Sequence, residues 1–245
     1  MTPQRIVSLV PSLTELIADL DLASSLAGRT RFCKHPDHIA GRVPIVGGTK
    51  NPRLDKIREI NPDMIIANVE ENRKEDIDVL KKDYPVYLTD IHTIEDALLT
   101  IHEMGVQFNA GDRAAELIEK INEELDGIPD EEPRSVTYFI WRAPWMTVGS
   151  DTYIHSVLER WKLTNVFGRH NRYPKVELSD VSRMNPDFIL LSSEPYPFRE
   201  KHKNDVFDAC PDSNILLVDG EWFSWYGSRM LPSFKKLNTF RKAIS

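Results

Sequence analysis

Aromatic side chains gather in the second half of the sequence, where they follow short apolar runs. Four of the five tryptophans belong to this set, which comprises Trp141, Trp145, Tyr196, Trp222, Phe223, Trp225 and Tyr226. Trp145, Trp222 and Trp225 fall outside any apolar period that would bury them in a sheet. Tryptophan and tyrosine combine an apolar face with a polar group at the edge, so together they suit a wide, flat ligand. For any one of them, a place in the core is an equally good interpretation.

Three arginines are candidates for binding the polar rim of such a ligand. Arg31, Arg142 and Arg229 each offer a rigid fork of N–H donors, which matches carboxylates and amides. A solvated surface position explains any single one of them better than a ligand does. Only their combination with the aromatic set favours a binding site.

The segment from Cys33 to His38 is the one stretch that brings soft metal-ligand types close together. Zinc sites normally need three or four ligands, and no other histidine lies in a matching motif. Cys33, His35 and His38 are therefore weak metal candidates, and a surface loop whose Phe32 packs inward is the favoured interpretation. If a tetrapyrrole binds, His35 is the first residue to test as its axial ligand.

Motifs of the common enzyme classes are missing from the sequence. The glycine-rich stretch from Val46 to Lys50 matches neither GxGxxG nor GxxxxGK[ST]. There is no GxSxG elbow and no HExxH pair. Ser12 lies at a predicted helix start, where serine is common as an N-cap. We therefore expect a protein without enzymatic activity and without a cofactor of its own.

The elements that position these residues alternate between apolar strands and segments of helical period, which is typical of βαβ units in an α/β fold with parallel sheets. Pro11 ends the first strand, and Ser12-Leu-Thr-Glu15 forms a capping box that opens a helix as far as about Leu20. The predicted strands cover residues 6–10, 64–67, 86–89, 136–141, 188–192 and 215–218.

The sequence repeats itself once. The segment Ile60-Asn-Pro-Asp-Met-Ile-Ile66 matches Met184-Asn-Pro-Asp-Phe-Ile-Leu190 at an offset of 186 − 62 = 124 residues. The same offset places Glu70 opposite Glu194, so each half follows its strand with a polar turn that holds a glutamate. A plain polar turn explains both residues as well, although their symmetry favours a shared role.

One amphipathic helix is predicted between the halves, from Gly111 to Gly127, and a Pro-rich acidic turn follows it. The expected domains are an N-terminal α/β lobe at 1–108, a linking helix and turn at 109–133, and a C-terminal α/β lobe at 134–245. Because a single long helix is stiffer than extended strands, large hinge closure is not expected.

Composition excludes several classes of partner. A net charge of −7 without long Lys/Arg blocks argues against nucleic acid. No apolar run approaches the ~20 residues of a membrane span, and two cysteines are too few for a disulfide framework. The start of the chain carries no signal peptide, so we expect a cytoplasmic location as the chain stands, or a periplasmic or cell-envelope location if a leader was removed.

Three motifs give the chain a resemblance to a known family, namely RIVSLVPSLTELI, INPDMIIA and MNPDFILL. Over nearly its whole length, the chain resembles the helical-backbone class of substrate-binding proteins. These receptors deliver cobalamin, haem or ferric siderophores to ABC importers. The resemblance implies two Rossmann-like lobes joined by one long helix, with a metal chelate bound in the cleft between them. It also implies an ABC importer permease as partner, and we expect a monomer. The segments ending at Gly149 and Trp225 are most similar to cobalamin binders.

The resemblance also marks where the chain departs from its family. Members that dock on an importer usually carry a glutamate seven residues before the Pro of each Pro-Asp motif. This chain has Asp55 and Ser179 there, with Asp180 beside the latter, so Asp55 and Asp180 are the candidate docking residues. Two alternatives stay open: a cytosolic binding or sensing relative that is not coupled to transport and, less favoured, an enzyme on the same fold.

Ligands of open parallel sheets collect outside the carboxyl ends of the strands. The loops expected there define the candidate ligand residues of each lobe. In the first lobe these are Pro11, Ser12, Arg31, Phe32, His35, Lys50, Glu70 and Asn72. In the second they are Arg142, Trp145, Glu194, Tyr196, Trp222, Trp225, Tyr226 and Arg229.

Overall fold

A computed structural model describes residues 4–245, and its chain divides into two units. The first unit contains Met1–Ile91, Glu95–Asn122 and Tyr226–Met230, and the second contains His92–Ile94, Glu123–Trp225 and Leu231–Ser245. The segment Tyr226–Met230 therefore returns to the first unit after the second sheet has been completed.

The first unit is built on a four-stranded parallel sheet with the order β2-β1-β3-β4. Strand β1 pairs with β3 in the register Ile6↔Met64 and Val7↔Ile65, and its own residues are fully buried. Both faces of the inner strands are covered, which explains why they read as continuous apolar runs rather than as alternating ones. The strands are β1 (Ile6–Ser8), β2 (Leu26–Arg29), β3 (Met64–Asn68) and β4 (Val86–Thr89).

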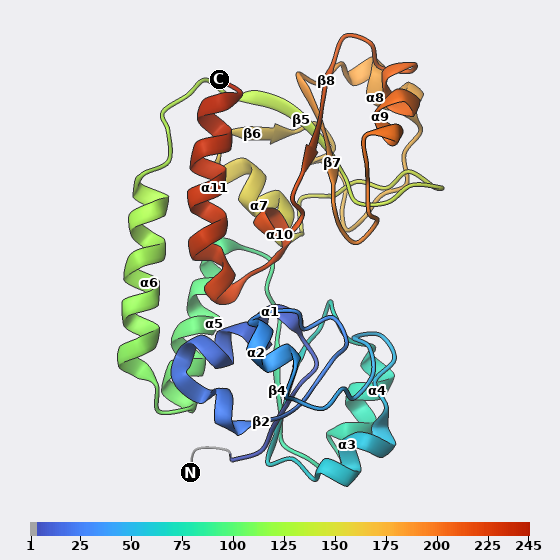
Figure 1. Cartoon of the computed structure of the whole chain (residues 1–245). Coiled ribbons are helices and arrows are strands. Elements are labelled where there is room, and N and C mark those ends of the chain that lie inside the picture. Colours follow the sequence, from blue (N-terminus) through green and yellow to red (C-terminus); the bar gives the residue numbers. More distant parts are fainter. Residues whose placement is uncertain (1–3) are drawn as a thin grey trace. The chain divides into compact units, whose positions relative to one another are not determined.

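Helices cover both faces of this sheet (Figure 1). On one face, α3 and α4 pack their Ile57, Ile77 and Leu80 against Val7 and Ile65 of the strands. On the other face lie α1, α2 and α5. The helices of the first unit are α1 (Pro11–Ile17), α2 (Asp37–Ala40), α3 (Leu54–Ile60), α4 (Lys74–Leu80) and most of α5 (Ile94–Gln107).

The second unit repeats this design with a four-stranded parallel sheet of order β6-β5-β7-β8. Helices α8 and α9 cover one face, where Val181 and Val206 meet Phe139, Ile189 and Leu191. The strands are β5 (Arg134–Phe139), β6 (Leu163–Asn165), β7 (Phe188–Ser192) and β8 (Asn214–Val218). The helices are α7 (Tyr153–Arg160), α8 (Leu178–Met184), α9 (Lys201–Phe207), α10 (Glu221–Ser224) and α11 (Met230–Ala243), which begins at the last residue of the first unit.

The Asn-Pro-Asp motif occupies the same place in both units, between the end of a helix and a strand. Asn61 ends α3 and Asn185 ends α8, each in the left-handed conformation that asparagine tolerates. The carboxylate of Asp63 then accepts hydrogen bonds from the N–H groups of Gln4 (2.9 Å) and Arg5 (3.1 Å), just before β1. The carboxylate of Asp187 accepts from the N–H of Ser135 (2.7 Å), at the start of β5. Each motif therefore ends a helix and ties the next strand to its neighbour.

The predicted linking helix is present as α6 (Gly111–Asp126), and its Ala114, Ile121 and Leu125 are buried as the period predicts. Its residues are divided between the two units at Asn122 and Glu123. Within residues 4–245, no helix is both long and apolar enough to span a membrane.

One local prediction is wrong, namely the capping box at Ser12. Helix α1 begins one residue earlier, at Pro11, and its N-cap Val10 makes no side-chain hydrogen bond. Proline suits the first helical position because its missing N–H would have had no partner there. Ser12 is instead a buried residue in the first turn of the helix.

Candidate functional site

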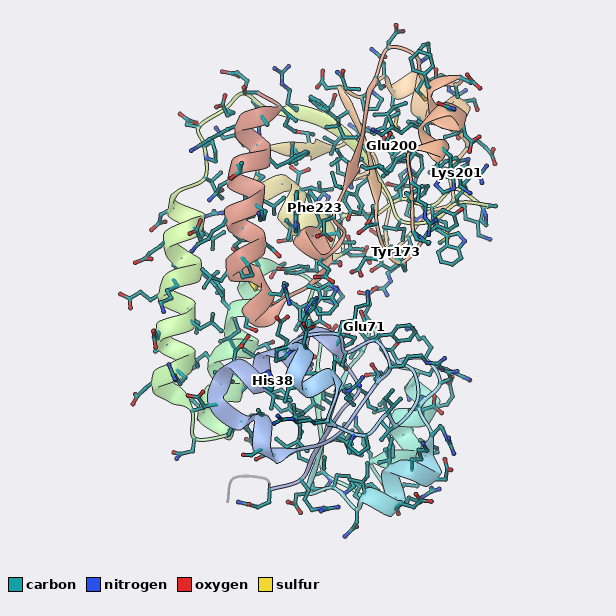
Figure 2. The ribbon with its side chains drawn as sticks, viewed as in Figure 1. His38, Glu71, Tyr173, Glu200, Lys201 and Phe223 are labelled. Carbon is teal, nitrogen blue, oxygen red and sulfur yellow. The ribbon has the colours of Figure 1, made fainter. Side chains whose placement is uncertain are left out.

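Each unit presents loops at the carboxyl ends of its strands, and these loops carry most of the predicted ligand residues. In the first unit they follow β1, β2 and β3, and Figure 2 labels Glu71 in the segment after β3 and His38 on α2, in the segment after β2. In the second unit they follow β5, β6, β7 and β8. We call these loops the first edge in the first unit and the second edge in the second unit. The first edge carries mainly polar side chains, whereas the second edge carries most of the aromatic ones.

Asn72 holds the loops of the first edge together. Its amide oxygen accepts a hydrogen bond from the N–H of Asn68 (2.9 Å), and its amide nitrogen donates to the carbonyls of Leu9 (3.2 Å) and Thr49 (3.0 Å). The side chain is only 4% exposed. Asn72 was expected to contact a ligand, but its donors and acceptor are engaged within the protein. Its position instead connects the segments that follow β1, β2 and β3.

A polar residue at the end of the third strand shapes the glutamate turn in both units. The side-chain oxygen of Asn68 accepts from the N–H groups of Glu70 (2.8 Å) and Glu71 (3.1 Å). At the equivalent position, the hydroxyl of Ser192 donates to the carbonyl of Glu194 (2.6 Å). Both glutamates predicted from the repeat therefore lie half-buried on matching turns. The ammonium of Lys50, which is exposed, donates to the carbonyl of Glu70.

Arg29 supports the loop that carries Arg31, Phe32 and His35, although it was not predicted as a functional residue. Its side chain is buried, and the guanidinium donates to the carbonyls of Thr30 (3.0 Å), Cys33 (3.3 Å) and Ala40. The only signal in the sequence was an arginine at the end of an otherwise apolar strand. Three carbonyls on one buried cation give this loop a defined shape.

Phe32 does not pack inward as expected, because its side chain is 47% exposed. The guanidinium carbon of Arg31 lies 5.7 Å from the centre of the Phe32 ring, within the range of a cation–π contact. Both side chains are exposed. The loop therefore presents an aromatic face and a cation side by side.

Cys33 is poorly placed for binding a metal ion. The side chain is 1% exposed, and its sulfur lies 3.1 Å from the hydroxyl of Thr14 and 3.3 Å from that of Thr30. His35 is half-buried, and His38 is exposed on α2. Across the part of the chain that the structure describes, no group of three or more His, Cys, Asp or Glu side chains is arranged to hold a metal ion.

Arg229 is engaged by a carboxylate of the protein itself. Its Nε donates to one oxygen of Glu15 (2.9 Å), and its terminal nitrogen donates to the other. The two side chains are 20% and 11% exposed. Burial raises the pKa of Glu15 above its usual value, although the bond from Arg229 acts in the opposite direction. Arg229 was expected to hold a ligand carboxylate, and within the first unit it ties the turn before α11 to α1.

The second edge contains a continuous set of aromatic rings. Trp145 lies between Phe139, with ring centres 4.8 Å apart, and Phe198, on which it stacks at 5.8 Å. Trp141 contacts the edge of Tyr196 at 5.6 Å and is 41% exposed. Trp145 and Tyr196 are half-buried because one side of each packs on the core. Trp141 is therefore the most accessible ring of this set.

Polar groups fix the aromatic set in place. Arg142 forms an ion pair with Asp205 (2.7 Å), and its guanidinium lies 6.0 Å from the centre of the Trp145 ring. The hydroxyl of Tyr196 lies 3.4 Å from Nε2 of His202. Nδ1 of His202 accepts the N–H of Arg199 (2.9 Å), so we assign the proton of the neutral ring to Nε2. Burial, followed by the charges of nearby Lys and Arg side chains, lowers the pKa of His202.

Trp225, a candidate ligand residue for which a place in the core was an equally good interpretation, is buried, with its side chain 8% exposed. Its ring N–H donates to the carboxylate of Glu194 (2.7 Å), which also accepts from the hydroxyl of Ser224 (2.9 Å). Tyr226 is buried as well. Trp222 is half-buried, with its ring 6.4 Å from that of Phe240. The bond from Trp225 ties the segment after β8 to the glutamate turn after β7, and none of these three side chains is exposed.

The remaining predicted residues lie on helices. Pro11 is half-buried at the first position of α1. Asp55 is exposed in the first turn of α3, where it pairs with Arg53 (3.2 Å), and this hydrogen bond lowers the pKa of its carboxyl. Asp180 lies in the first turn of α8 and pairs with Arg183. The two candidate docking carboxylates therefore occupy corresponding helices of the two units.

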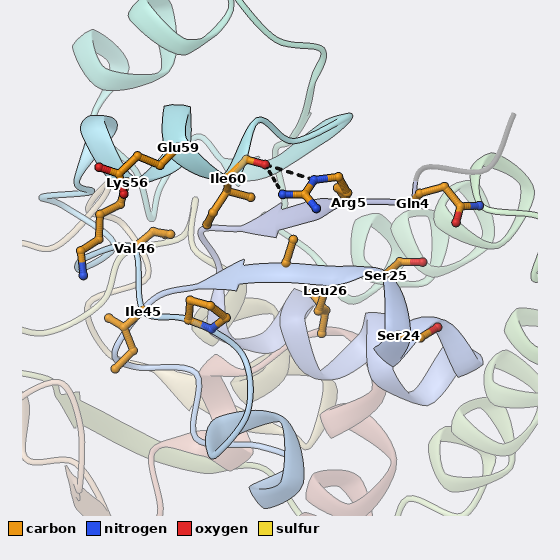
Figure 3. Close-up of a pocket in the computed structure, with 12 residues that line it drawn as sticks. Gln4, Arg5, Ser24, Ser25, Leu26, Ile45, Val46, Lys56, Glu59 and Ile60 are labelled. Carbon is orange, nitrogen blue, oxygen red and sulfur yellow. Dashed lines mark hydrogen bonds between the residues drawn. The ribbon is translucent and has the colours of Figure 1, made fainter.

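A hollow of ≈ 830 Å³ in the first unit is lined by residues near the amino ends of the strands and by Pro44, Ile45 and Val46 of the segment after β2 (Figure 3). Gln4 and Arg5 line it before β1 begins, Ser24 and Ser25 line it before β2, and Lys56 contributes from α3. The guanidinium of Arg5 binds the carbonyl of Ile60 at its wall. The hollow therefore borders the amino ends of the strands, whereas the predicted ligand residues follow their carboxyl ends.

Comparisons with known proteins agree with this architecture. Residues 6–209 match the periplasmic binding protein family. The chain is 24% identical to YvrC of Bacillus subtilis (strain 168), an uncharacterized ABC transporter substrate-binding lipoprotein, over 96% of this chain and 79% of that protein. It is 21% identical to the vitamin B12-binding protein of Vibrio campbellii (strain ATCC BAA-1116), over 96% of this chain and 88% of that protein.

The same fold occurs in solved structures. The periplasmic heme-binding protein BhuT, in complex with two hemes, superposes with a TM-score of 0.85 and 18% identity, covering 100% of both chains. The prediction of two α/β lobes with parallel sheets is thereby confirmed.

Proposed function

Since the chain belongs to the periplasmic binding protein family, we propose that it binds a metal chelate and delivers it to an ABC importer, without transforming it. The chelate classes that we consider are a cobalamin-like corrinoid, a haem and a ferric siderophore. The relatives support this choice, since one is a vitamin B12-binding protein, another binds hemes, and a third is a substrate-binding lipoprotein of an ABC transporter. Their periplasmic and lipoprotein character supports a role in the cell envelope.

The aromatic set of the second unit is the observation that carries the proposal. Trp141 exposes 41% of its surface, while the rings behind it are fixed by packing on the core and by the pair of Tyr196 and His202. An exposed tryptophan on a rigid aromatic support offers a preformed face for a flat macrocycle or an aromatic chelator. Arg142 follows Trp141 in the chain and lies over the Trp145 ring, and its guanidinium, which also pairs with Asp205, supplies a cation for the rim of the ligand.

Docking on an importer is supported by the placement of Asp55 and Asp180. Both are in the first turn of a helix that leads into an Asn-Pro-Asp motif, one in each unit. Ser179 occupies the position that corresponds to Asp55, and it carries no charge. This difference supports a second candidate function, in which the protein binds its chelate without an importer.

Binding can be tested with the purified chain of residues 1–245. We would incubate it with haemin, cyanocobalamin and ferric citrate in separate samples, remove free ligand by desalting, and record absorbance and tryptophan fluorescence. We expect at least one chelate to co-elute. Failure of all three to bind at tens of micromolar would reject the proposal.

The role of the aromatic face can be tested with a matched pair of variants. Trp141→Ala should weaken binding of the chelate about three- to tenfold, the range expected for loss of one aromatic contact. Phe207→Ala is the control, because Phe207 is also an exposed aromatic residue (56%) but ends α9 outside the aromatic set. Equal affinities of the two variants would contradict the assigned face.

A further inference from the structure

Strand β4, at one end of the first sheet, has a side that pairs with no other strand, because β4 is last in the order β2-β1-β3-β4. The carbonyls of Pro85 and Thr89 accept hydrogen bonds from N–H groups of β3 and of the residue after it (3.0 and 2.9 Å). Since the direction of the backbone groups alternates along a strand, Val86 and Leu88 turn theirs away from β3. Each of these two residues therefore offers an N–H donor and a carbonyl acceptor to the outer side of β4.

The opposite end of the sheet is covered in a way that β4 is not. Beside the outer strand β2, the N–H of Arg29 donates to the carbonyl of Pro44 (2.9 Å), and the carbonyl of Arg29 accepts from the N–H of Val46 (2.8 Å). The segment around Ile45 thus pairs with the end of β2. Within residues 4–245, no comparable bridge joins the outer side of β4. Unpaired backbone groups on an outer strand are a template for another extended segment.

Helix α5 forms a groove with this outer side of β4. The groove has a volume of ≈ 140 Å³, and its walls are residues 87–90 and four residues of α5, among them Leu99 and Glu103. The hydroxyl of Tyr87 donates to the carboxylate of Glu103 (3.0 Å), which connects this face of α5 to the strand. The whole groove belongs to the first unit.

Apolar side chains are exposed on both walls of the groove. Leu88 is exposed on the strand, and Leu99 is exposed on the helix. Val106, seven residues after Leu99, continues the same face of α5 and is exposed as well. In the second unit, the equivalent strand β8 has its Leu216 and Leu217 half-buried. Large apolar side chains that are grouped on one exposed surface indicate a contact with another molecule.

The charge of this region is one-sided. Residues 83–112 contain no lysine or arginine, although the whole chain has 31 of them. The same residues contain six carboxylates, namely Asp83, Asp90, Glu95, Asp96, Glu103 and Asp112. Asp90, Asp96 and Glu103 line the groove itself. Lysine commonly protects outer strands against unwanted pairing, and β4 has none. The groove therefore favours an occupant that carries cations.

We propose that the outer side of β4 and the adjoining face of α5 bind an extended, basic segment of another protein, which adds to the first sheet as a further strand. The backbone groups of Val86 and Leu88 supply its hydrogen bonds, and Leu88 and Leu99 contact its apolar side chains. The carboxylates of the groove attract its lysines or arginines. A second copy of this chain is a poor occupant, because pairing β4 with itself brings two sets of carboxylates together. The inference does not depend on which chelate the protein binds.

The first test measures binding of synthetic peptides to the unaltered chain of residues 1–245. The probe is a fluorescein-labelled peptide of seven residues in which lysine alternates with valine. One comparison peptide has glutamate in place of lysine. The other keeps the sequence and charge of the probe but has its three central residues in the D configuration, which disrupts strand pairing. In fluorescence anisotropy at 20 mM salt, we expect the probe to bind at least tenfold more tightly than either comparison peptide, and less tightly at 150 mM salt.

The second test changes an apolar wall of the groove. Leu88→Thr keeps a residue that suits a strand and should weaken binding of the probe about tenfold, the size expected for loss of one apolar contact. Ile45→Thr is the matched control, because Ile45 is also an exposed apolar residue beside an outer strand of the same sheet. Circular dichroism checks that both variants remain folded, and the peptide comparison needs neither of them.

The third test addresses charge and location. Glu103→Gln can still accept the hydrogen bond from Tyr87, and it should weaken binding of the probe about threefold. Glu119→Gln removes an exposed carboxylate from α6 of the same unit and should leave binding unchanged. Hydrogen exchange followed by NMR should show that the probe slows exchange of the Leu88 amide, since this N–H faces outward.

Each outcome either supports the inference or rejects it. Equal affinities for the three peptides, or no binding of the probe at 1 mM, reject it. Equal affinities of Leu88→Thr and Ile45→Thr, or slowed exchange that is confined to segments other than β4, also reject it. If sedimentation velocity shows a dimer that Leu88→Thr abolishes, the occupant is a second copy and the inference is wrong. The predicted preferences in a monomeric chain support it.

Discussion

The carboxylate of Glu15 and the guanidinium of Arg229 form a bidentate ion pair across a sequence separation of 214 residues. Both side chains are largely buried, and both belong to the first unit. Replacing Arg229 with Met would leave a buried carboxylate without its cation. Breaking this ion pair should destabilise the protein more than breaking an exposed pair and less than breaking a fully buried one. We therefore expect the free energy of unfolding at pH 7 to fall by about 2 kcal/mol.

A double variant provides the control for this change. Glu15→Gln in the Arg229→Met background removes the unpaired charge and should recover most of the lost stability in urea unfolding. If the double variant is as unstable as Arg229→Met alone, the loss comes from packing rather than from charge.

Stability should depend on pH through Glu15. Because burial raises the pKa of Glu15 in the folded state above the unfolded value of 4.5, the folded protein binds this proton more tightly. The contribution is thus fully present below pH 4.5 and is lost as the pH rises through the folded pKa. Comparing urea midpoints of the unaltered protein and Glu15→Gln across this range tests the sign. If the unaltered protein instead gains stability relative to Glu15→Gln as the pH rises, the predicted sign is wrong.

The two aspartates of the Asn-Pro-Asp repeat, Asp63 and Asp187, should contribute similar amounts to the stability of their own units. Asp63→Ala and Asp187→Ala each remove hydrogen bonds to a strand entry and should destabilise their own unit by about 1–2 kcal/mol. Hydrogen exchange of the Arg5 and Ser135 amides reports the two units separately. Asp130→Ala is the control, since the ion pair of Asp130 with Lys162 is on the surface.

The pH dependence of the Asp187 contact has a defined direction. Hydrogen bonds from Ser135 lower the pKa of Asp187 in the folded protein below its unfolded value of 3.8. Its contribution is therefore present above pH 3.8 and is lost as the pH falls through the lower, folded value. Acid titration should lower the protection of the Ser135 amide, measured as its exchange rate relative to the intrinsic rate at each pH, in the unaltered protein and leave the protection in Asp187→Ala unchanged.

Arg29 should control the shape of the loop that carries Arg31 and His35. Lysine keeps the charge but lacks the fork of donors that reaches Thr30, Cys33 and Ala40, so Arg29→Lys should expose residues 30–40 to faster hydrogen exchange and proteolysis. Arg42→Lys changes an exposed arginine of the same loop and serves as control. Identical exchange in both variants would show that Arg29 does not position this loop.

The parts of the fold that depend on neighbouring residues were predictable from the sequence. Asn61 and Asn185 end helices, and the apolar strands after them are buried, because these outcomes follow from local conformation and period. The amphipathic helix of α6 was predictable for the same reason. The capping box failed because Pro11 competes for the same helix start and occupies the first position.

The candidate site was less predictable, because its contacts join residues that are distant in sequence. The burial of Trp225 depends on Glu194, which lies 31 residues earlier. The side-chain amide of Asn72 donates a hydrogen bond to the carbonyl of Leu9, which lies 63 residues earlier. Neither partner follows from the type or spacing of the residue concerned. By contrast, the second-edge positions of Trp141 and Trp145 followed from the strand that precedes them.

The return of Tyr226–Met230 to the first unit has a consequence for the order of synthesis. A growing chain exposes its N-terminal part to solvent first, and domains generally fold in that order. Here the ribosome must finish the second sheet before it makes the arginine that neutralises Glu15. The unit whose translation begins first is thus completed only at residue 230, near the end of the chain, and a nascent chain stalled before residue 226 carries an unpaired buried acid in its first helix.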